Sequence, residues 1–480
     1  MHTSKPRVSN ITFSTVTSAT GLPTVAAGPS RPRSSSYWKP QDRESRSGEY
    51  FTSPHSLRDG SQSICEIFVP YYALKKFGYC CFNLDRVYCS SSCEINEEAI
   101  QTNDGVVYDT RELDNDGTLE RISEWAFPIL EFGERNKTTA LSKVAYTIFK
   151  QFDLFRIFKL SLVKFFNFFH SLERGYWDIP YHNRFHAADV MHGCYYLTCH
   201  PVKPRFGNPD SANSYPNDSY SVPIADSMST LELMALYTAA AMHDYDHPGR
   251  TNAFLVASED RKAILYNDRS VLENHHAAES WKLLCKPENS FIETFDAAEA
   301  KRFRFLVLEY ILATDLKQHF DIITEFREKS LEMDLGNESD RVIISQMLIK
   351  FADINSPTKP YDLHVQWTKR LCEEFYSQGD EEKRLGLAVS PYMDRNEPAV
   401  AKLQDSFISH MVAPLAHALN EAGLLPSCPG LPKAEVMVNL EYNHTKWLNE
   451  LEKERSSDDE EDVSKDDTSS SENVNETVKF

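Results

Sequence analysis

Apolar residues recur every three or four positions through most of residues 122–425, which is the period of an α-helix that buries one face. The aromatic residues of 152–169 follow this period most clearly and predict one helix with an aromatic stripe. Strand-type alternation is nearly absent. Further helical patterns cover residues 231–242, 303–320, 341–352, 363–375, 400–422 and 435–455. The pattern predicts an all-α fold, a compact bundle of many helices.

Composition divides the chain around this helical region. Residues 1–60 are rich in Ser, Thr, Pro and Arg, and we expect a disordered tail there. Residues 61–121 form an N-terminal region to which the pattern assigns no fold. The main helical domain is expected at 122–455, interrupted by a Pro-, Asn- and Ser-rich loop insertion at 201–229. Residues 456–480 are acidic and are expected to be a disordered tail.

The formal net charge is -20. Such a chain repels a phosphate backbone, so we expect no nucleic-acid partner. A small anionic substrate remains compatible, because bound cations reverse the local field. No signal-peptide pattern opens the chain, and no apolar run reaches membrane-spanning length. We therefore expect a cytoplasmic protein with no transmembrane segment, for which peripheral membrane association is left open.

Two groups of serines are candidate sites for regulatory kinases. Ser34 to Ser36 follow Arg31 and Arg33, a pattern that suits a basic-directed kinase. Ser456 and Ser457 precede the acidic run 458–462, which suits an acid-directed kinase. A solvated tail is the alternative interpretation in both places. The sequence leaves the oligomeric state open, a homodimer included.

Three clusters of metal-capable side chains stand beside or at the ends of apolar helical runs. They are Tyr181-His182-Asn183-Arg184-Phe185-His186 with Asp189, His243-Asp244-Tyr245-Asp246-His247, and Asp353 with Asn355. His182 and His186 would share one face of a helix. Imidazole suits zinc, carboxylate suits zinc and magnesium, and two ions roughly 3.5–4 Å apart can clamp a phosphate. Spacing does not decide which members of the second cluster ligate, and helix capping is the alternative role for each.

Together these motifs resemble those of the class I 3′,5′-cyclic-nucleotide phosphodiesterases. The similarity spans roughly residues 122–455, which the resemblance identifies as the catalytic domain. The matching segments are 181–189, 243–252, 272–276, 313–315 and 352–353. Within that group the chain is most similar to the cGMP-inhibited type 3 subfamily. That similarity rests on segments 240–246, 250–257 and 407–410 and on the position of the insertion.

The resemblance implies a two-metal site of the His-Asp (HD) type. The tighter ion, usually zinc, would be held by His186, His243, Asp244 and Asp353. Asp244 would bridge to a second ion, usually magnesium (or manganese). His247, Glu273 and Thr314 would orient the ligands and metal-bound water. By the same resemblance, His182 is the general acid and not a ligand.

A purine pocket is also implied. Gln404 and Phe407 share one face of a helical run, and the resemblance assigns the Gln amide to the purine edge and the Phe ring to its face. Leu371 falls where the family has the opposite apolar wall, and Tyr181 and His364 would line the pocket. From spacing alone, Phe407 would be a core residue and Gln404 a surface amide.

The implied function is hydrolysis of cAMP and cGMP to 5′-nucleoside monophosphates, which terminates cyclic-nucleotide signalling. Two alternatives remain. A broader His-Asp phosphohydrolase acting on other nucleotides needs neither His182 nor the pair Gln404 and Phe407. An inactive nucleotide-sensing scaffold would be expected to have lost a metal-ligating residue, and the sequence retains all four of them.

Overall fold

The computed structural model describes residues 15–17, 23–25, 99–206, 221–427 and 433–469, with side chains up to Ser456 in the last range. Contacts divide the chain into two compact units, Met1–Val25 with Glu97–Phe480, and Ala26–Asn96. Every described residue belongs to the first unit. Most of the tail expected to be disordered at 1–60 therefore lies outside the described residues.

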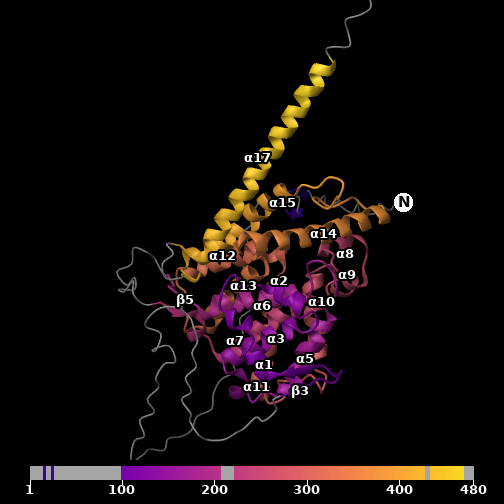
Figure 1. Cartoon of the computed structure of the whole chain (residues 1–480). Helices are drawn as coiled ribbons and strands as arrows, with labels where there is room; N and C mark the ends of the chain where they lie inside the picture. Colours follow the sequence, from indigo (N-terminus) through magenta and orange to yellow (C-terminus); the bar gives the residue numbers. More distant parts are fainter. Residues whose placement is uncertain (1–14, 18–22, 26–98, 207–220, 428–432, 470–480) are drawn as a thin grey trace, which may run out of the picture. The chain divides into compact units, whose positions relative to one another are not determined.

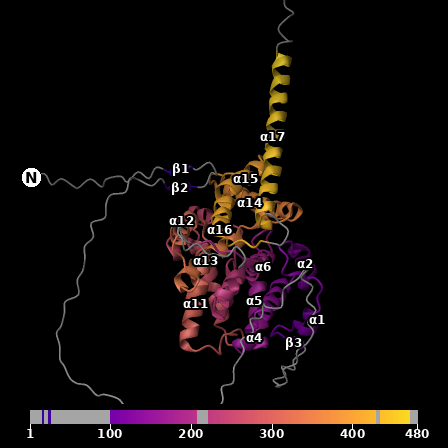
Figure 2. The ribbon, with the colours of Figure 1, turned by 90° about the vertical axis from the view of Figure 1, so that its left-hand side faces the viewer.

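The predicted all-α class is confirmed, and Figures 1 and 2 show the packed helices from two sides. The helices of the first half are α1 (Thr110–Asp114), α2 (Ile129–Arg135), α3 (Ala140–Gln151), α4 (Leu154–Ile157), α5 (Leu162–Gly175), α6 (Arg184–Cys199) and α7 (Thr230–Met242). Those of the second half are α8 (Asn252–Ala257), α9 (Arg261–Tyr266), α10 (Val271–Leu284), α11 (Ala297–Leu312), α12 (His319–Ser330), α13 (Glu338–Asp353), α14 (Tyr361–Leu385), α15 (Val400–Phe407), α16 (Ala413–Glu421) and α17 (Glu435–Ser469).

Shorter elements join these helices. The 3₁₀ turns are η1 (Leu119–Arg121), η2 (Ile224–Ser227), η3 (Leu316–Gln318) and η4 (Ser356–Thr358), and η5 (Ile408–Val412) is a π-helix. The strands form antiparallel pairs: β1 (Thr15–Thr17) with β2 (Pro23–Val25), β3 (Ala99–Gln101) with β4 (Val107–Asp109), and β5 (Pro201–Val202) with β6 (Val222–Pro223). The first pair lies inside the segment expected to be disordered, where β-branched Thr and Val favour extended backbone.

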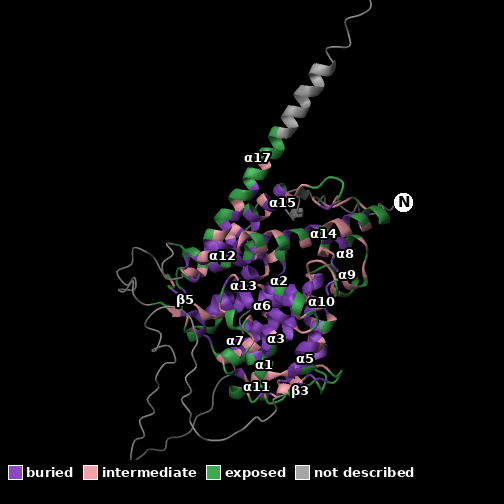
Figure 3. Ribbon diagram, viewed as in Figure 1, coloured by how far each residue is buried: buried purple, intermediate pink, exposed green. Residues whose placement is uncertain are grey.

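The centre of the core is α7, which packs against α6 and α11. From Glu232 to Met242 every residue of α7 is buried, as expected for a helix that is apolar on all sides. Ser229 and Glu232 form a capping box at its start, and Arg341 of α13 pairs with Glu232 at 3.0 Å. In Figure 3 the buried residues concentrate around α3, α5, α6 and α7. The helix is thereby held firmly at the end opposite His243.

The single helix predicted over 152–169 is wrong in detail, because the chain breaks between α3, α4 and α5. Asp153 and Lys159 adopt left-handed backbone, with φ of 55° and 50°. The aromatic side chains nevertheless meet: the ring centroids of Phe149 and Phe165 are 5.0 Å apart. Two separate helices, α4 and α5, that pack with α3 around one aromatic cluster satisfy the same apolar spacing as one long helix.

Two other predicted helices are also interrupted. The pattern over 303–320 breaks after α11, and Asp315 caps η3 by accepting from the backbone N of Lys317. The pattern over 400–422 contains the π-turn η5 between α15 and α16. π-Turns inside helices occur frequently at functional sites. These breaks fall at Thr314 and just after Phe407, both candidate site residues.

The described fold also begins earlier and continues later than the boundaries expected at 122 and 455. Ile100 and Tyr108 are buried in the main core. At the other end α17 continues to Ser469, because a helix anchored by packing extends at low cost.

Within the insertion, Lys203 N donates to Gly423 O at 3.1 Å, and residues 207–220 lie outside the described ranges. No helix among the described residues is long and apolar enough to cross a membrane.

A carboxylate from α5 caps α3. Thr139, at the N-cap of α3, makes no side-chain capping bond. Glu173 instead accepts from Leu141 N at 3.0 Å, Ser142 N at 3.1 Å and Ser142 Oγ at 2.7 Å. Burial raises the pKa of Glu173 from its ordinary value of 4.5 to about 7, and the three donors oppose that rise. The carboxylate thus satisfies donors that would otherwise be orphaned in the core.

Replacing Glu173 by Ala leaves these three donors buried without an acceptor. We expect the free energy of unfolding, measured by urea titration at a pH above 7, to fall by about 2–4 kcal/mol. Glu131→Ala is the matched control on the exposed face of α2 and should change stability by less than about 0.5 kcal/mol. Equal stability of the two variants would contradict the capping role.

Candidate metal centre and active site

The ends of three packed helices carry the predicted metal ligands. His186 lies in the first turn of α6, where Asn183 caps the helix by accepting from Phe185 N at 2.8 Å. His243 is the C-cap of α7, and Asp353 is the last residue of α13. Because α6, α7 and α13 pack against one another, their ends meet. The rigid core therefore positions the cluster.

The four side chains converge on one point. His243 Nε2 lies 3.3 Å from His186 Nε2, and each of these atoms lies 3.1–3.2 Å from Asp353 Oδ1. Asp244 Oδ2 lies 3.2 Å from His243 Nε2 and 3.4 Å from His186 Nε2. The candidate ligand atoms all lie within 4.8 Å of one another. The structure thus brings together the residues of the predicted tight site.

The tautomer of His243 favours cation binding. Its Nδ1 donates to the carbonyl of Ala240 at 2.8 Å, so the lone pair of Nε2 faces the cluster. Two nitrogens and two carboxylates around one point form a donor set that zinc and similar cations accept. Burial would raise the pKa of Asp353, but the bonded imidazoles of His186 and His243 hold it well below its ordinary value. The residues present fit a divalent cation.

A second group of donors shares Asp244. Its Oδ1 lies 3.6 Å from His276 Nε2, and His276 Nδ1 donates to Tyr245 O at 2.6 Å. Asp244, His247 and His276 also qualify as a group able to hold a metal. The two oxygens of Asp244 therefore face two neighbouring positions. His276 was not assigned a role from the sequence, although it follows Glu273 by three positions in the matched 272–276 segment.

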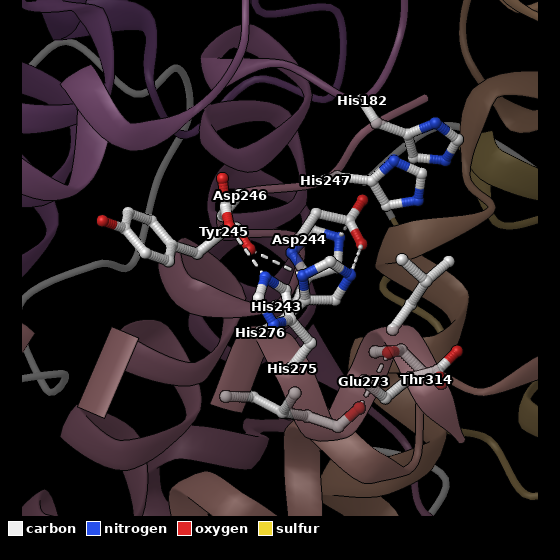
Figure 4. A network of polar contacts seen from close by, with 12 residues as sticks. His182, His243, Asp244, Tyr245, Asp246, His247, Glu273, His275, His276 and Thr314 are labelled. Carbon is white, nitrogen blue, oxygen red and sulfur yellow. Dashed lines mark hydrogen bonds and ion pairs between the residues drawn. The ribbon is translucent and has the colours of Figure 1, made fainter. Parts of the chain in front are cut away.

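Two of the predicted orienting residues, Glu273 and Thr314, are buried. Asn252 Nδ2 contacts both oxygens of Glu273 at 3.1 Å, and burial raises the pKa of Glu273 to about 7. Thr314 is buried and donates to Ile311 O at 2.8 Å. Figure 4 shows Glu273 and Thr314 on one side of Asp244 and the rings of His182 and His247 on another.

His182 precedes α6 instead of lying on it, so the expectation of a shared helix face with His186 is wrong. The helix starts only after the Asn183 cap. The rings still approach, with centroids 5.8 Å apart, and His182 stacks on His247 at 4.0 Å. His182, the candidate general acid, therefore lies beside the metal cluster on the loop that precedes α6.

Glu374, which the sequence did not reveal, holds His182. It bonds to His182 Nδ1 through Oε1, while its Oε2 accepts from Tyr181 N and His182 N at 3.0 Å each. Burial alone would lower the pKa of His182, but the charge and bond of Glu374 raise it to about 9. The contact with Glu374 therefore favours the protonated form of His182. One sequence feature could have indicated this role: Glu374 lies at helical spacing from His364, Trp367 and Leu371, so it shares their face of α14.

The candidate purine-pocket residues lie on α14, on α15 and in the loop before α6. Gln404 is buried, which excludes the surface-amide alternative, and Phe407, Leu371 and Tyr181 are partly buried. His364 is fully buried: its Nδ1 lies 3.0 Å from Ser356 Oγ, and its Nε2 accepts from Trp447 Nε1 at 2.8 Å. Both nitrogens of His364 are thus engaged by protein groups.

Two other polar residues of the sequence motifs have structural partners. Asp189 forms a buried ion pair with Lys359 at 3.1 Å. Asp246 accepts from Trp177 Nε1 and pairs with His275, both at 2.7 Å. Of the two aspartates in the second motif, Asp244 faces the histidine cluster and Asp246 does not.

The sequence and the fold of the chain are similar to those of known proteins. The model of the family described as 3′5′-cyclic nucleotide phosphodiesterase matches residues 181–429, just over half of the 480 residues. The probable 3′,5′-cyclic phosphodiesterase pde-3 of Caenorhabditis elegans is 59% identical over 94% of this chain and 63% of its own length. The cGMP-inhibited 3′,5′-cyclic phosphodiesterase 3A of Rattus norvegicus is 49% identical over 65% of this chain and 30% of its own length.

The chain thus spans less than two thirds of the length of these relatives. Among solved structures, the phosphodiesterase domain of the RhoPDE fusion protein from Salpingoeca rosetta is 26% identical, with a TM-score of 0.59 over 72% of this chain and 100% of that domain. The similarity to type 3 proteins agrees with the subfamily expected from the motifs. On these grounds the chain belongs to the 3′,5′-cyclic nucleotide phosphodiesterase family.

Proposed function

We propose that the chain hydrolyses cAMP and cGMP to 5′-nucleoside monophosphates with two divalent cations, and so terminates cyclic-nucleotide signalling. Zinc is proposed at the tighter position and magnesium or manganese at the second. The observation that carries the proposal is the convergence of His186, His243, Asp244 and Asp353 beside His182, whose Nδ1 bonds to Glu374. Family membership supports the same activity.

Each side chain has a task in this reaction. The bound cations would neutralise the cyclic phosphate and supply an activated water. Asp244 would help to hold both cations, and the facing of its two oxygens toward different imidazoles supports this role. His182 donates a proton to the departing 3′ oxygen, which is otherwise a poor leaving group. Glu374 keeps the ring of His182 oriented and charged.

The purine is proposed to bind Gln404 and Phe407, with Leu371 on the opposite face and Tyr181 and His364 around it. The Gln404 amide carries one acceptor and two donors, so one orientation suits adenine and the reverse suits guanine. The ring nitrogens of His364 are engaged by Ser356 and Trp447, so His364 does not hold the amide of Gln404 in one orientation. Both nucleotides therefore fit the proposal.

A cytoplasmic location and control by kinases complete the proposal. Ser34 to Ser36 lie outside the described residues, whereas Ser456 is exposed on α17. Its Oγ donates to Glu452 O at 2.7 Å, and the acidic run follows directly. An acid-directed kinase would find this serine accessible.

Hydrolysis should depend on the cation cluster. We expect the purified chain to convert cAMP and cGMP to 5′-monophosphates, and a chelator to abolish turnover until divalent metal is restored. Asp353→Ala should lower bound metal, measured by elemental analysis, and reduce kcat/KM by at least about 10³-fold. Turnover of other nucleotides in place of cyclic ones would favour the broader phosphohydrolase, and absence of turnover with no bound metal would favour the scaffold.

The proton-donor role makes a separate prediction. His182→Ala should lower kcat on the order of 10²–10⁴-fold with unchanged metal content, because the 3′ alkoxide must then leave unprotonated. The matched control is His417→Ala on the exposed face of α16, which should retain full activity. Near-normal turnover by the His182 variant would remove this residue from the mechanism.

The preference between cAMP and cGMP tests whether the Gln404 amide is free to adopt either orientation. We expect the kcat/KM values for cAMP and cGMP to lie within about a thousandfold of each other, since no hydrogen bond among the described residues locks Gln404 in one orientation. Gln404→Ala should lower both values. A larger preference, equivalent to more than about 4 kcal/mol, would show that the amide is held in one orientation.

A further inference from the structure

Asp246 lies two residues after Asp244 in the same turn, but its carboxylate faces other partners. Its Oδ1 accepts from Trp177 Nε1 and its Oδ2 from His275 Nε2, both at 2.7 Å. Its φ is 61°, a left-handed conformation that non-glycine residues adopt at an energetic cost. In Figure 4, Tyr245 and Asp246 turn to one side of Asp244, and His182 and His247 lie on the other. A strained residue with both oxygens engaged needs an explanation.

The two bonds of Asp246 join three segments of the site. Trp177 stands near the start of the loop 176–183, which carries His182. His275 belongs to α10, which also carries Glu273 and His276. Asp246 itself belongs to the turn 243–249, which carries Asp244 and His247. One carboxylate therefore ties the acid loop, the metal turn and α10 together.

Neighbouring contacts make this junction rigid. Tyr176 Oη donates to Ala241 O at 2.8 Å and accepts from Asp244 N at 3.3 Å. His276 Nδ1 donates to Tyr245 O from the α10 side. The end of α5, directly before this loop, approaches the turn so closely that a Cβ on Gly175 would lie 2.1 Å from the Tyr245 ring. The turn is thus held by the loop and by α10, and Asp246 bonds to both.

Two other roles for Asp246 fit less well. Among the described residues, the groups of side chains able to share a metal do not include Asp246. A simple surface ion pair explains neither the left-handed backbone nor the second bond, which goes to an indole. Tyr176 also holds the loop through its 2.8 Å bond to Ala241 O at the end of α7, but its bond from Asp244 N in the metal turn is long at 3.3 Å.

We propose that Asp246 is a positioning residue: by bridging Trp177 and His275 it fixes the loop bearing His182 relative to the turn bearing Asp244. It touches neither substrate nor cation. The inference rests on the proposed function, in which His182 protonates the leaving oxygen. Misplacing a proton donor by an ångström can reduce a rate about a hundredfold, so the bridge should matter most for substrates that need protonation.

The test compares two substrates on one set of variants. Asp246→Gly removes the carboxylate but tolerates the left-handed backbone, and Trp177→Phe removes only the indole donor. Asp268→Gly is the control, an exposed aspartate with φ of 58° outside the site. The substrates are cAMP, whose 3′ alkoxide needs a proton, and bis(p-nitrophenyl) phosphate, whose p-nitrophenolate leaves without one.

For Asp246→Gly and Trp177→Phe we expect kcat on cAMP to fall roughly 10–100-fold, with KM changed less than about threefold. Hydrolysis of bis(p-nitrophenyl) phosphate and the bound metal content should stay within about twofold of the unmodified protein. Asp246→Asn should retain most of the cAMP activity, because its amide oxygen can still accept from Trp177 and Asn tolerates left-handed backbone. Asp268→Gly should match the unmodified protein on both substrates.

Equal losses on both substrates, or loss of metal, would overturn the inference and make Asp246 a support of the metal turn alone. Unchanged cAMP turnover would overturn it as well. The indole N–H resonance of Trp177 in nuclear magnetic resonance spectra should shift in Asp246→Gly, and an unshifted resonance would deny the bond itself. Absence of cyclic-nucleotide turnover in the unmodified protein would instead refute the proposed function, so the two failures are distinguishable.

Discussion

The structure depends on one electrostatic constraint, the burial of two imidazole nitrogens and two carboxylates around a single point. His186 Nε2 and His243 Nε2 stand 3.3 Å apart. Lone pairs that close repel unless a proton or a cation lies between them. The backbone bond of His243 Nδ1 leaves its Nε2 free to accept such a cation. The packed ends of α6, α7 and α13 hold the cluster together, so the apolar core is also the scaffold of the chemistry.

Hydrogen bonds from residues outside the metal cluster determine the pKa and the orientation of the histidines around it. Glu374 raises the pKa of His182, whereas burial alone would lower it. His276 presents Nε2 to Asp244 because Tyr245 O occupies its other nitrogen. These partners come from α14, α10 and the turn after α7, far apart in sequence. The proton donor and the cation site are therefore separate units that the fold must align, which is the task assigned to Asp246.

Much of the fold and of the cation cluster was predictable, because helical periodicity and polar residues at helix ends are local signals. The helix breaks at Asp153 and Thr314 were not, since apolar spacing is the same for one helix and for several that share a core. Family resemblance supplied the choice of Asp244 over Asp246, which spacing left open. Glu374 could not be placed on His182 from sequence, because the contact joins residues 192 positions apart.

The proposed chemistry requires that His186, His243, Asp244 and Asp353 together hold one cation. A crystal of the metal-loaded protein, measured on both sides of the zinc absorption edge, tests this requirement. We expect one strong anomalous peak about 2.0–2.3 Å from an atom of each of the four side chains. An anomalous peak elsewhere, or one that contacts only one of these helices, would contradict it.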